Sequence, residues 1–308
     1  MKKKKKIILV TGSSGLIGYP LIKKLIDLDY FVIGLDPRKL IEENVQYKHL
    51  SNIELDKNQF LEILENHQIS DVIHTGGVSG PMLFNDEPYE IINNNIFFTL
   101  NLIEASRIYN KINRFIFCSS ISAYGDLDKK NTDESLKFSP TNLYGASKAS
   151  LDLILEKYFQ IYNLDIIALR FSTVYGSRRT TDCFIKDMIE SAKNNIELTL
   201  PFNQDLKWPY IYVEDAVSSI VSSLLHHKTH NYSYNVSGPD FPSYYEITEE
   251  INKYYKNFNP KFLNSDSFQK RELFSIKKIK KDINWMPTFD IKKGVKDFVE
   301  NLSATSKQ

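Results

Sequence analysis

Cysteine is scarce in this sequence, with only Cys118 and Cys183 among its 308 residues. Two cysteines are too few for a disulfide framework or a structural zinc site. Long apolar runs are also missing, since no stretch approaches the roughly 18 residues that a membrane span needs. The apolar stretch after the basic start of the chain, residues 7–10, is too short for an export signal. The sequence therefore predicts a reduced, cytoplasmic protein without a metal site or a membrane partner.

An excess of one charge is absent as well. The chain has 39 lysine and arginine residues against 38 aspartate and glutamate residues, for a formal net charge of +1. No overall electrostatic field therefore favours nucleic acid or an acidic membrane as a partner. The one dense basic segment, Lys2 to Lys6, has no interleaved aromatic residues, and we interpret it as a solvated tail. The composition is that of an ordinary globular protein.

Short apolar segments alternate with longer segments of helical periodicity through the first two-thirds of the chain. Residues 6–12 form an apolar run closed by glycine, as expected for a strand buried on both faces. Residues 17–30 then repeat apolar side chains at helical spacing. Further strands are predicted at 31–36, 71–77, 114–120 and 164–176, and further helices at 94–110 and 142–163. This order predicts an α/β fold with a doubly wound parallel sheet.

Beyond Gly176 the alternation loosens and prolines become frequent. Residues 210–227 still have the pattern of a strand and a helix of the main body, with Asp215 placed to cap the helix. We therefore expect two domains. One comprises residues 1–176 with about 208–238, and a smaller mixed domain comprises about 177–207 with 239–308.

A glycine-rich loop follows the first predicted strand. The segment VTGSSGLIG places Gly12, Gly15 and Gly18, with Leu16 and Ile17 between them, at the start of the first helix. Glycines there permit a tight turn, close approach of the backbone to a pyrophosphate, and close packing of helix on strand. The helix amino terminus offers unpaired N–H groups to a phosphate. The loop predicts a Rossmann-type dinucleotide site.

The second predicted strand ends at Asp36. A carboxylate at this place can hold the 2′-hydroxyl of an adenosine ribose and would repel a 2′-phosphate, so NAD is favoured over NADP. The neighbouring Arg38 keeps NADP open as an alternative.

The segment YGASK places Tyr144 four residues before Lys148, so that the two side chains share one face of a helix. The pair by itself fits either a catalytic site or an exposed helix face. The order of several segments decides between these readings: TGSSGLIG, DVIHTGG, FIFCSSISAYG, YGASK, LRFSTVYG, YIYVEDA and INWMP. Over nearly the whole chain they resemble the extended short-chain dehydrogenase/reductase family, the NAD-dependent nucleotide-sugar epimerases and dehydratases typified by UDP-galactose 4-epimerase.

The resemblance implies a catalytic trio of Ser120, Tyr144 and Lys148. Removing hydride from a secondary alcohol requires that the hydroxyl proton also leaves, and a free tyrosine titrates too high to accept it at neutral pH. The family places a lysine ammonium and the positive nicotinamide near the tyrosine to lower its pKa. Tyr144 would then be the base. Lys148 would lower the pKa of Tyr144 and bind the cofactor, and the Ser120 hydroxyl would orient the substrate oxygen.

The resemblance also implies further cofactor contacts. They lie against the pyrophosphate, the adenine and the nicotinamide, and they comprise Thr75, Gly76, Gly77, Asn95, Asn52, Ile53, Cys118, Phe171 and Ser172. Asn95 would support the loop, and Cys118 is interpreted as a small buried residue at a strand end.

The segment after Ser120 bears on the type of reaction. A 4,6-dehydratase of this family carries an Asp-Glu pair there, whereas this chain has Ile121 and Ser122. The pattern favours a nucleotide-sugar epimerase over a dehydratase. An NAD-dependent dehydrogenase of a free sugar, aldonate or related polyol stays as the alternative. A non-catalytic NAD-binding protein is less favoured because the trio is intact.

The substrate pocket is where the chain departs from the family. Family epimerases usually carry an arginine just before the YIYVED-like strand, and this chain has Trp208 and Pro209 there. Arg271 resembles a second pyrophosphate arginine, while Lys207, Arg178, Arg179 and Lys270 are further basic candidates. The predicted substrate contacts are Ser79, Ser120, Ser122, Thr173, Trp208 and Arg271.

A homodimer is also expected. Relatives pair through the helix after Asn95 and the helix that carries Tyr144. The second helix has more apolar residues than one core-facing stripe requires. These residues are Leu151, Ile154, Leu155, Tyr158 and Phe159.

Overall fold

The computed structural model describes residues 5–51, 53–80, 82–84, 86–127, 132–227, 231–263 and 269–305. Asn52, which was predicted to contact the adenine, lies outside the described residues. Within these ranges no helix is long and apolar enough to cross a membrane. The same residues contain no group of three or more His, Cys, Asp or Glu side chains that could hold a metal ion.

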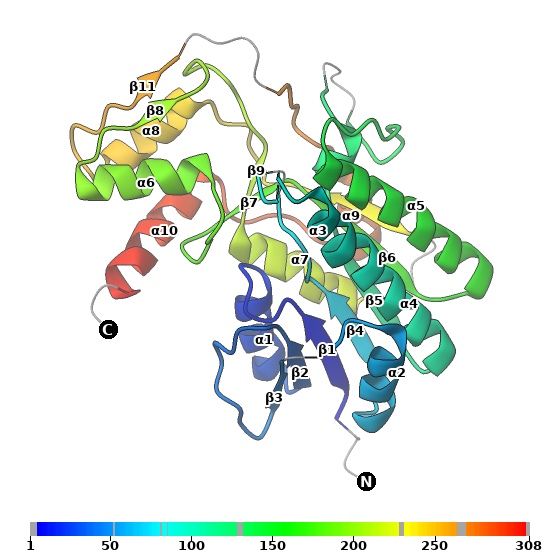
Figure 1. Ribbon diagram of the computed structural model, residues 1–308. Coiled ribbons are helices and arrows are strands. Elements are labelled where there is room, and N and C mark those ends of the chain that lie inside the picture. Colours follow the sequence, from blue (N-terminus) through cyan, green and yellow to red (C-terminus); the bar gives the residue numbers. More distant parts are fainter. Residues whose placement is uncertain are drawn as a thin grey trace.

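The centre of the molecule is a seven-stranded sheet in which every neighbouring pair of strands is parallel (Figure 1). In spatial order the strands are β10 (Ser233–Val236), β6 (Ile166–Phe171), β5 (Arg114–Ser120), β4 (Asp71–His74), β1 (Ile7–Thr11), β2 (Phe31–Leu35) and β3 (Tyr47–Leu50). The chain winds outward from β1 in both directions, so the carboxyl ends of β1 and β4 meet where the winding reverses. This confirms the predicted Rossmann-type doubly wound sheet.

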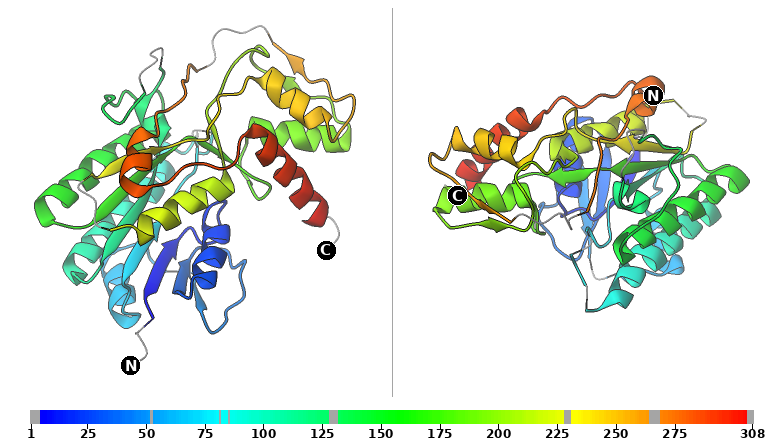
Figure 2. Two further views of the ribbon diagram at one scale, coloured as in Figure 1. Left: turned by 180° about the vertical axis from the view of Figure 1, so that it is seen from behind. Right: turned by 90° about the horizontal axis from the view of Figure 1, so that it is seen from above.

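Helices cover both faces of this sheet. Figure 2, in its right-hand view, shows α2 (Lys57–Asn66), α4 (Phe98–Tyr109) and α5 (Leu143–Tyr162) together on one face. The other face carries α1 (Gly18–Asp27), α7 (Val213–Leu225) and α9 (Lys277–Ile283). The central strands are apolar on both sides because each face packs against a helix layer, and Val10, Ile73 and Ile116 are fully buried.

A smaller group of elements lies beyond the carboxyl ends of the strands (Figure 1). It contains α6 (Phe184–Asn194), α8 (Tyr244–Asn252), α10 (Ile291–Thr305) and the two-stranded sheet of β8 (Thr199–Leu200) and β11 (Lys261–Phe262). Two further short strands, β7 (Thr173–Tyr175) and β9 (Tyr210–Tyr212), pair with each other near the junction. The residue boundaries of the two domains stay a prediction.

Two local expectations were wrong. The strand at 210–212 pairs with β7 and does not join the seven-stranded sheet, although α7, which follows it, packs on that sheet. Asp215 does not cap α7. Its carboxylate accepts the backbone N–H groups of Thr288 and Phe289 at 2.8–2.9 Å, so it fastens the segment before α10 to α7.

The apolar residues that suggested a dimer face mostly inward. Leu151 and Leu155 of α5 are fully buried in the chain's own core, and Tyr158 and Phe159 are partly buried against it. Other α5 side chains are more exposed, including Leu153 at 52% and Ile161 at 67%. The homodimer therefore stays a prediction without support from the residues first named for it.

Candidate active site

One cavity of about 1060 Å³ opens at the carboxyl ends of β1, β4, β5 and β6. Parallel α/β sheets bind ligands at this place, where the winding of the strands reverses. Its walls include most of the residues predicted from the sequence, namely Gly12, Gly15, Leu16, Ile17, Asp36, Ile53, Thr75, Gly76, Gly77, Ser79, Cys118, Ser120, Ser122, Tyr144, Lys148, Phe171, Ser172, Thr173, Trp208 and Arg271. Gly18 and Asn95 do not line the cavity. Gly18 packs against the Gly12 carbonyl, and the Asn95 side chain accepts the Val78 N–H, so both contact residues that do line it.

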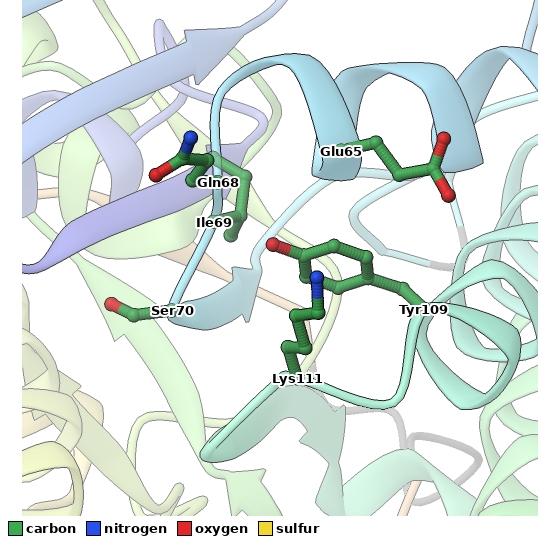
Figure 3. A pocket seen from close by; sticks show the side chains of 6 residues that line it. All are labelled: Glu65, Gln68, Ile69, Ser70, Tyr109 and Lys111. Atoms are coloured by element: carbon green, nitrogen blue, oxygen red, sulfur yellow. The ribbon is translucent and has the colours of Figure 1, made fainter.

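A second hollow, of about 580 Å³, lies near the opposite ends of the strands, between the end of α2 and the end of α4 (Figure 3). Glu65, Gln68 and Lys111 line it together with the buried ring of Tyr109. None of the predicted site residues lies there, and we place the chemistry in the larger cavity.

The glycine loop after β1 is shaped by backbone contacts. Gly12 has φ of +66°, a conformation that residues with a side chain rarely adopt. A Cβ atom on Gly12 would lie 2.8 Å from the Gly76 backbone, and one on Gly18 would overlap the Gly12 carbonyl oxygen. The first turn of α1 therefore lies directly against the loop, which leaves its amino end facing the cavity.

Asp36 is held rigidly beside this loop. One carboxylate oxygen accepts the Ser14 N–H at 3.1 Å and the other accepts the Arg38 N–H at 2.9 Å. The Arg38 guanidinium lies 3.6 Å from the same carboxylate and is drawn toward it. Arg38 was the reason to keep NADP open. Its pairing with Asp36 favours NAD, because an added 2′-phosphate would meet the carboxylate first.

The predicted trio comes from two adjoining segments. Ser120 ends β5, and its hydroxyl oxygen accepts the Ser122 N–H at 3.1 Å at the start of a short 3₁₀ turn. Asn142 caps α5 by accepting the Gly145 N–H at 2.8 Å. A Cβ atom on Gly145 would overlap the Ser122 carbonyl oxygen, so α5 begins directly against this turn. The close approach brings Tyr144 and Ser120 to the same cavity wall, and the Ser120 hydroxyl acts to lower the pKa of the Tyr144 phenol.

The pKa of Tyr144 departs from the sequence-based expectation. Burial raises the pKa of the phenol above its ordinary value of 10, and the Ser120 hydroxyl and the Arg179 guanidinium offset only part of this rise. Lys148 Nζ lies 6.0 Å from the centre of the Tyr144 ring. The protein alone therefore does not lower this pKa, and the predicted lowering requires the positive charge of a bound nicotinamide.

Lys148 is buried at the floor of the cavity. Its ammonium donates to the Cys118 carbonyl oxygen at 3.0 Å and lies 4.9 Å from the centre of the Phe117 ring. Burial lowers the pKa of Lys148 from 10.5 to about 8, although Cys118 and Asp152 act in the opposite direction. Burial also raises the pKa of the Cys118 thiol to about 12, so Cys118 is a neutral wall residue as predicted.

The buried Lys148 ammonium should make the stability of the protein depend on pH. Between about pH 8 and 10.5 the unfolded chain holds a proton that the folded chain has released, so the free energy of unfolding rises with pH. The shift corresponds to about 3 kcal/mol. Urea unfolding from pH 7 to 10 should therefore show the wild type gaining stability relative to Lys148→Met. Parallel curves for the two proteins would contradict the assignment.

The cavity wall also carries Arg271, Trp208 and Thr173. The Trp208 indole N–H donates to the Thr173 hydroxyl at 2.8 Å, and the Arg271 guanidinium lies 5.5 Å from the centre of the Trp208 ring. Arg271 is only 7% exposed and donates to the Gly125 carbonyl oxygen. Its nearest carboxylate, Asp126, lies 3.4 Å away and is itself half-exposed. The Gln269 side-chain oxygen also accepts from the guanidinium at 3.1 Å, so Arg271 is a buried cation beside the cavity with one half-exposed carboxylate near it.

Part of the wall was missed by the sequence analysis. It is the segment that leads into α6, with Thr181, Asp182 and Cys183 followed by Phe184 and Asp187. This segment lies in the region where the strand–helix alternation loosens, and no spacing pattern indicated it. Of the further basic candidates, Arg179 lines the cavity.

The cavity fits a dinucleotide on evidence internal to the structure. The glycines pack so closely that a Cβ atom on Gly12 or Gly18 would clash with neighbouring backbone, so only glycine lets the backbone of this loop, with the first turn of α1 packed against it, border the cavity. The buried Ser172 hydroxyl, on the cavity wall, has no hydrogen-bond partner among the described residues. A buried hydroxyl without a partner costs free energy, which a bound polar group would recover.

Fold and cavity together define the class as a Rossmann-type fold with a tyrosine–lysine pair in the cavity at the carboxyl ends of its strands. Within that class, the model of the NAD dependent epimerase/dehydratase family matches residues 8–237. The chain therefore belongs to the NAD-dependent epimerase/dehydratase family.

Individual proteins agree with this membership. An uncharacterized protein of Methanocaldococcus jannaschii is 29% identical over 96% of this chain and 95% of its own length. The UDP-glucuronate 4-epimerase of Thermodesulfobacterium geofontis is 25% identical over 94% of this chain and 93% of its own. The crystal structure of UDP-glucose 4-epimerase from Thermotoga maritima, with UDP-glucose, superimposes with a TM-score of 0.88 at 24% identity, covering 97% and 99% of the two chains.

Proposed function

We propose that this protein is an NAD-dependent epimerase of a nucleotide-activated sugar. The observation that carries the proposal is that one cavity is lined both by Ser120, Tyr144 and Lys148 and by the buried guanidinium of Arg271. A guanidinium binds a diphosphate through parallel hydrogen bonds, so a cavity with both features suits a sugar linked to a nucleoside diphosphate. Relatives named as UDP-sugar 4-epimerases support the same substrate class.

Each residue of the trio has a separate task. Bound NAD would supply the acceptor for a hydride from the sugar carbinol carbon. Tyr144 takes the proton of the reacting hydroxyl and returns it at the end of the cycle. Ser120 donates a hydrogen bond that orients the reacting oxygen, and Lys148, fixed by the Cys118 carbonyl, holds positive charge beneath the site. Thr75 to Gly77, Asp36 and the glycine loop are the proposed cofactor contacts.

A dehydratase is less compatible with the site, because Ile121 and Ser122 follow Ser120 where an acid–base pair would be needed. A dehydrogenase of a free sugar or aldonate remains a second candidate on one observation. Trp208 occupies the place of the usual pyrophosphate arginine, and its indole is held by Thr173. The two candidates differ in whether the hydride returns to the sugar.

The deciding experiment begins with the purified protein, denatured to release its cofactor. An epimerase must keep its cofactor while the keto intermediate exists, so about one NAD per chain is expected. The protein is then incubated with UDP-, dTDP-, GDP- and CDP-sugars, and the products are separated by chromatography. An epimer without accumulated NADH supports the proposal. NADH formation from free sugars or aldonates, with no change in any nucleotide sugar, would reject it.

Arg271→Gln provides the matched variant for the same assay. Its NAD content should equal that of the wild type, while the KM for the nucleotide sugar should rise by about ten- to a hundredfold. Arg271→Lys keeps the charge but not the paired donors, and it should recover only part of the loss. Equal KM values in all three proteins would remove Arg271 from the substrate site.

A further inference from the structure

His74 is a buried residue that the proposed reaction does not use. It ends β4, is 1% exposed, and lies just before the cofactor loop at Thr75 to Gly77. Its ring is enclosed by Phe98 at 4.8 Å and Phe117 at 5.9 Å between ring centres. Inside this apolar enclosure each ring nitrogen has one hydroxyl partner. Nδ1 lies 2.6 Å from the Thr11 hydroxyl oxygen, and Nε2 lies 2.8 Å from that of Thr99.

The partners of the two hydroxyls determine where each hydrogen lies. Thr99 donates its only hydroxyl hydrogen to the Asn95 carbonyl oxygen at 2.6 Å. It must therefore accept from His74, which places the imidazole hydrogen on Nε2. Nδ1 of a neutral imidazole is then an acceptor, so the Thr11 hydroxyl donates to it. A proton on Nδ1 would leave the Thr11 hydrogen without its acceptor.

On the Thr11 side, this order extends to the cofactor loop. The Thr11 hydroxyl oxygen accepts the Gly76 N–H at 3.1 Å, and the Thr75 hydroxyl donates to the Thr11 carbonyl oxygen at 2.7 Å. A Cβ atom on Gly76 would lie 2.9 Å from the Phe98 ring, so the loop is pressed against the same enclosure. The loop position thus depends on a hydroxyl whose direction His74 fixes.

On the Thr99 side, the chain of hydrogen bonds reaches α5, the helix that carries Tyr144 and Lys148. Asn95 lies in a π-helical turn (Ile92–Phe97), a distortion often found at functional sites. Its side-chain oxygen accepts the Val78 N–H at 2.8 Å, and its amide donates to the Ser147 hydroxyl at 2.9 Å. Ser147 in turn donates to the Tyr144 carbonyl oxygen at 2.7 Å.

We propose that His74, held as the neutral Nε2–H tautomer, is a positioning residue. It fixes the positions of the cofactor loop and of the first turn of α5 relative to the glycine loop after β1. The proposal rests on the proposed cofactor site, since the loop in question is the one assigned to NAD. His74 touches neither cofactor nor substrate in this arrangement and acts through Thr11, Thr99 and Asn95.

The electrostatic surroundings agree with a neutral ring. Burial, with a smaller contribution from the Lys148 ammonium, lowers the pKa of His74 from 6.5 to about 3. Lys148 is the charged group of α5 that acts on the ring, while β1, β5 and α4 present Thr11, Phe117, Phe98 and Thr99 to it. The tautomer should therefore persist through the range in which the protein is folded.

The first test is nuclear magnetic resonance of the wild-type protein labelled with ¹⁵N-histidine, without added nucleotide. Spectra that resolve the two ring nitrogens should show one histidine fixed in the Nε2–H form from pH 5 to 9. Its signals are assigned by their loss in His74→Asn. A ring that titrates near pH 6.5, or that carries its hydrogen on Nδ1, overturns the proposal. This outcome is independent of whether NAD binds.

The second test is the dissociation constant for NAD, measured by calorimetry on protein stripped of cofactor. His74→Phe keeps an aromatic ring but removes both hydrogen bonds, and it should weaken NAD binding at least fivefold. His74→Asn retains an oxygen near the Nδ1 position and should recover part of the affinity. A merely structural role would lower the melting temperature of both variants without separating their affinities.

Matched controls come from His67, a partly exposed residue at the end of α2. His67→Phe and His67→Asn should bind NAD as the wild type does. A folded His74→Phe with less than a fivefold loss, or with the same affinity as His74→Asn, overturns the proposal. If His74→Phe does not fold, the proposal is tested by the loss of NAD affinity in His74→Asn and by the tautomer of His74 in the wild type. Failure of the wild type to bind NAD would instead reject the proposed cofactor site.

Discussion

Tyr144→Phe is expected to lower the turnover of the nucleotide sugar at least about a thousandfold, while the protein keeps its full content of NAD. The phenol is the group placed to accept the substrate proton, and general-base catalysis contributes up to about ten-thousandfold. The ring itself would stay in place. Asn142 still caps α5, and Gly145 still packs against the Ser122 carbonyl. Turnover by chromatography and NAD content after denaturation measure the two quantities separately.

Tyr162→Phe is the matched control for this variant. Tyr162 ends the same helix and is 50% exposed, so loss of its hydroxyl should leave turnover within twofold of the wild type. If Tyr144→Phe retained a tenth or more of the wild-type turnover, Tyr144 would not be the base. A loss of NAD together with turnover would point to a binding role instead.

Gly18→Ala should weaken NAD binding about a hundredfold, equivalent to about 2.7 kcal/mol. The new methyl group would overlap the Gly12 carbonyl oxygen and also approach the Ser13 Cα atom to 3.0 Å. These are backbone atoms of the phosphate loop and cannot move aside as the end of a flexible side chain would. The first turn of α1 must shift away, which moves its unpaired N–H groups from the phosphate. Calorimetric titration with NAD measures the loss.

Gly15→Ala separates this steric cause from a general cost of losing glycine. A Cβ atom there would lie 3.1 Å from the Gly12 oxygen, a tight contact that a small adjustment relieves. Its loss of NAD affinity should be clearly smaller than that of Gly18→Ala. The steric argument fails if the two variants bind NAD equally well, or if the Gly18 variant matches the wild type. Circular dichroism of both variants checks that the fold is retained.

Local patterns were sufficient for most of the sheet. Ile8, Leu9 and Val10 form an uninterrupted apolar run, and such a run is characteristic of a strand covered by helices on both faces. β3 lacked this signal. Its sequence YKHL alternates, with Lys48 exposed and Tyr47 buried, as suits the edge of a sheet. The pairing of β9 with β7 was also beyond prediction, because pairing partners are set by tertiary packing.

The candidate site shows the same division. Glycines in a strand-to-helix turn and a Tyr–Lys pair at helical spacing are local signals, and both lie in the cavity. The pKa of Tyr144 is not local, since burial by surrounding segments outweighs the neighbouring hydroxyl and guanidinium groups. The role proposed for His74 depends on hydroxyls from β1 and α4, which no spacing in DVIHTGG reveals.

The link between Asp215 and the segment before α10 bears on how the chain can be divided. The family match ends at residue 237, yet the Asp215 carboxylate is 1% exposed and receives its hydrogen bonds from Thr288 and Phe289. A fragment that stopped at the end of the match would lose both donors, together with the segment that they hold against α7. The helix α7, which packs on the central sheet, is thus tied to residues far along the chain, and a division of the chain at residue 237 would cut this link.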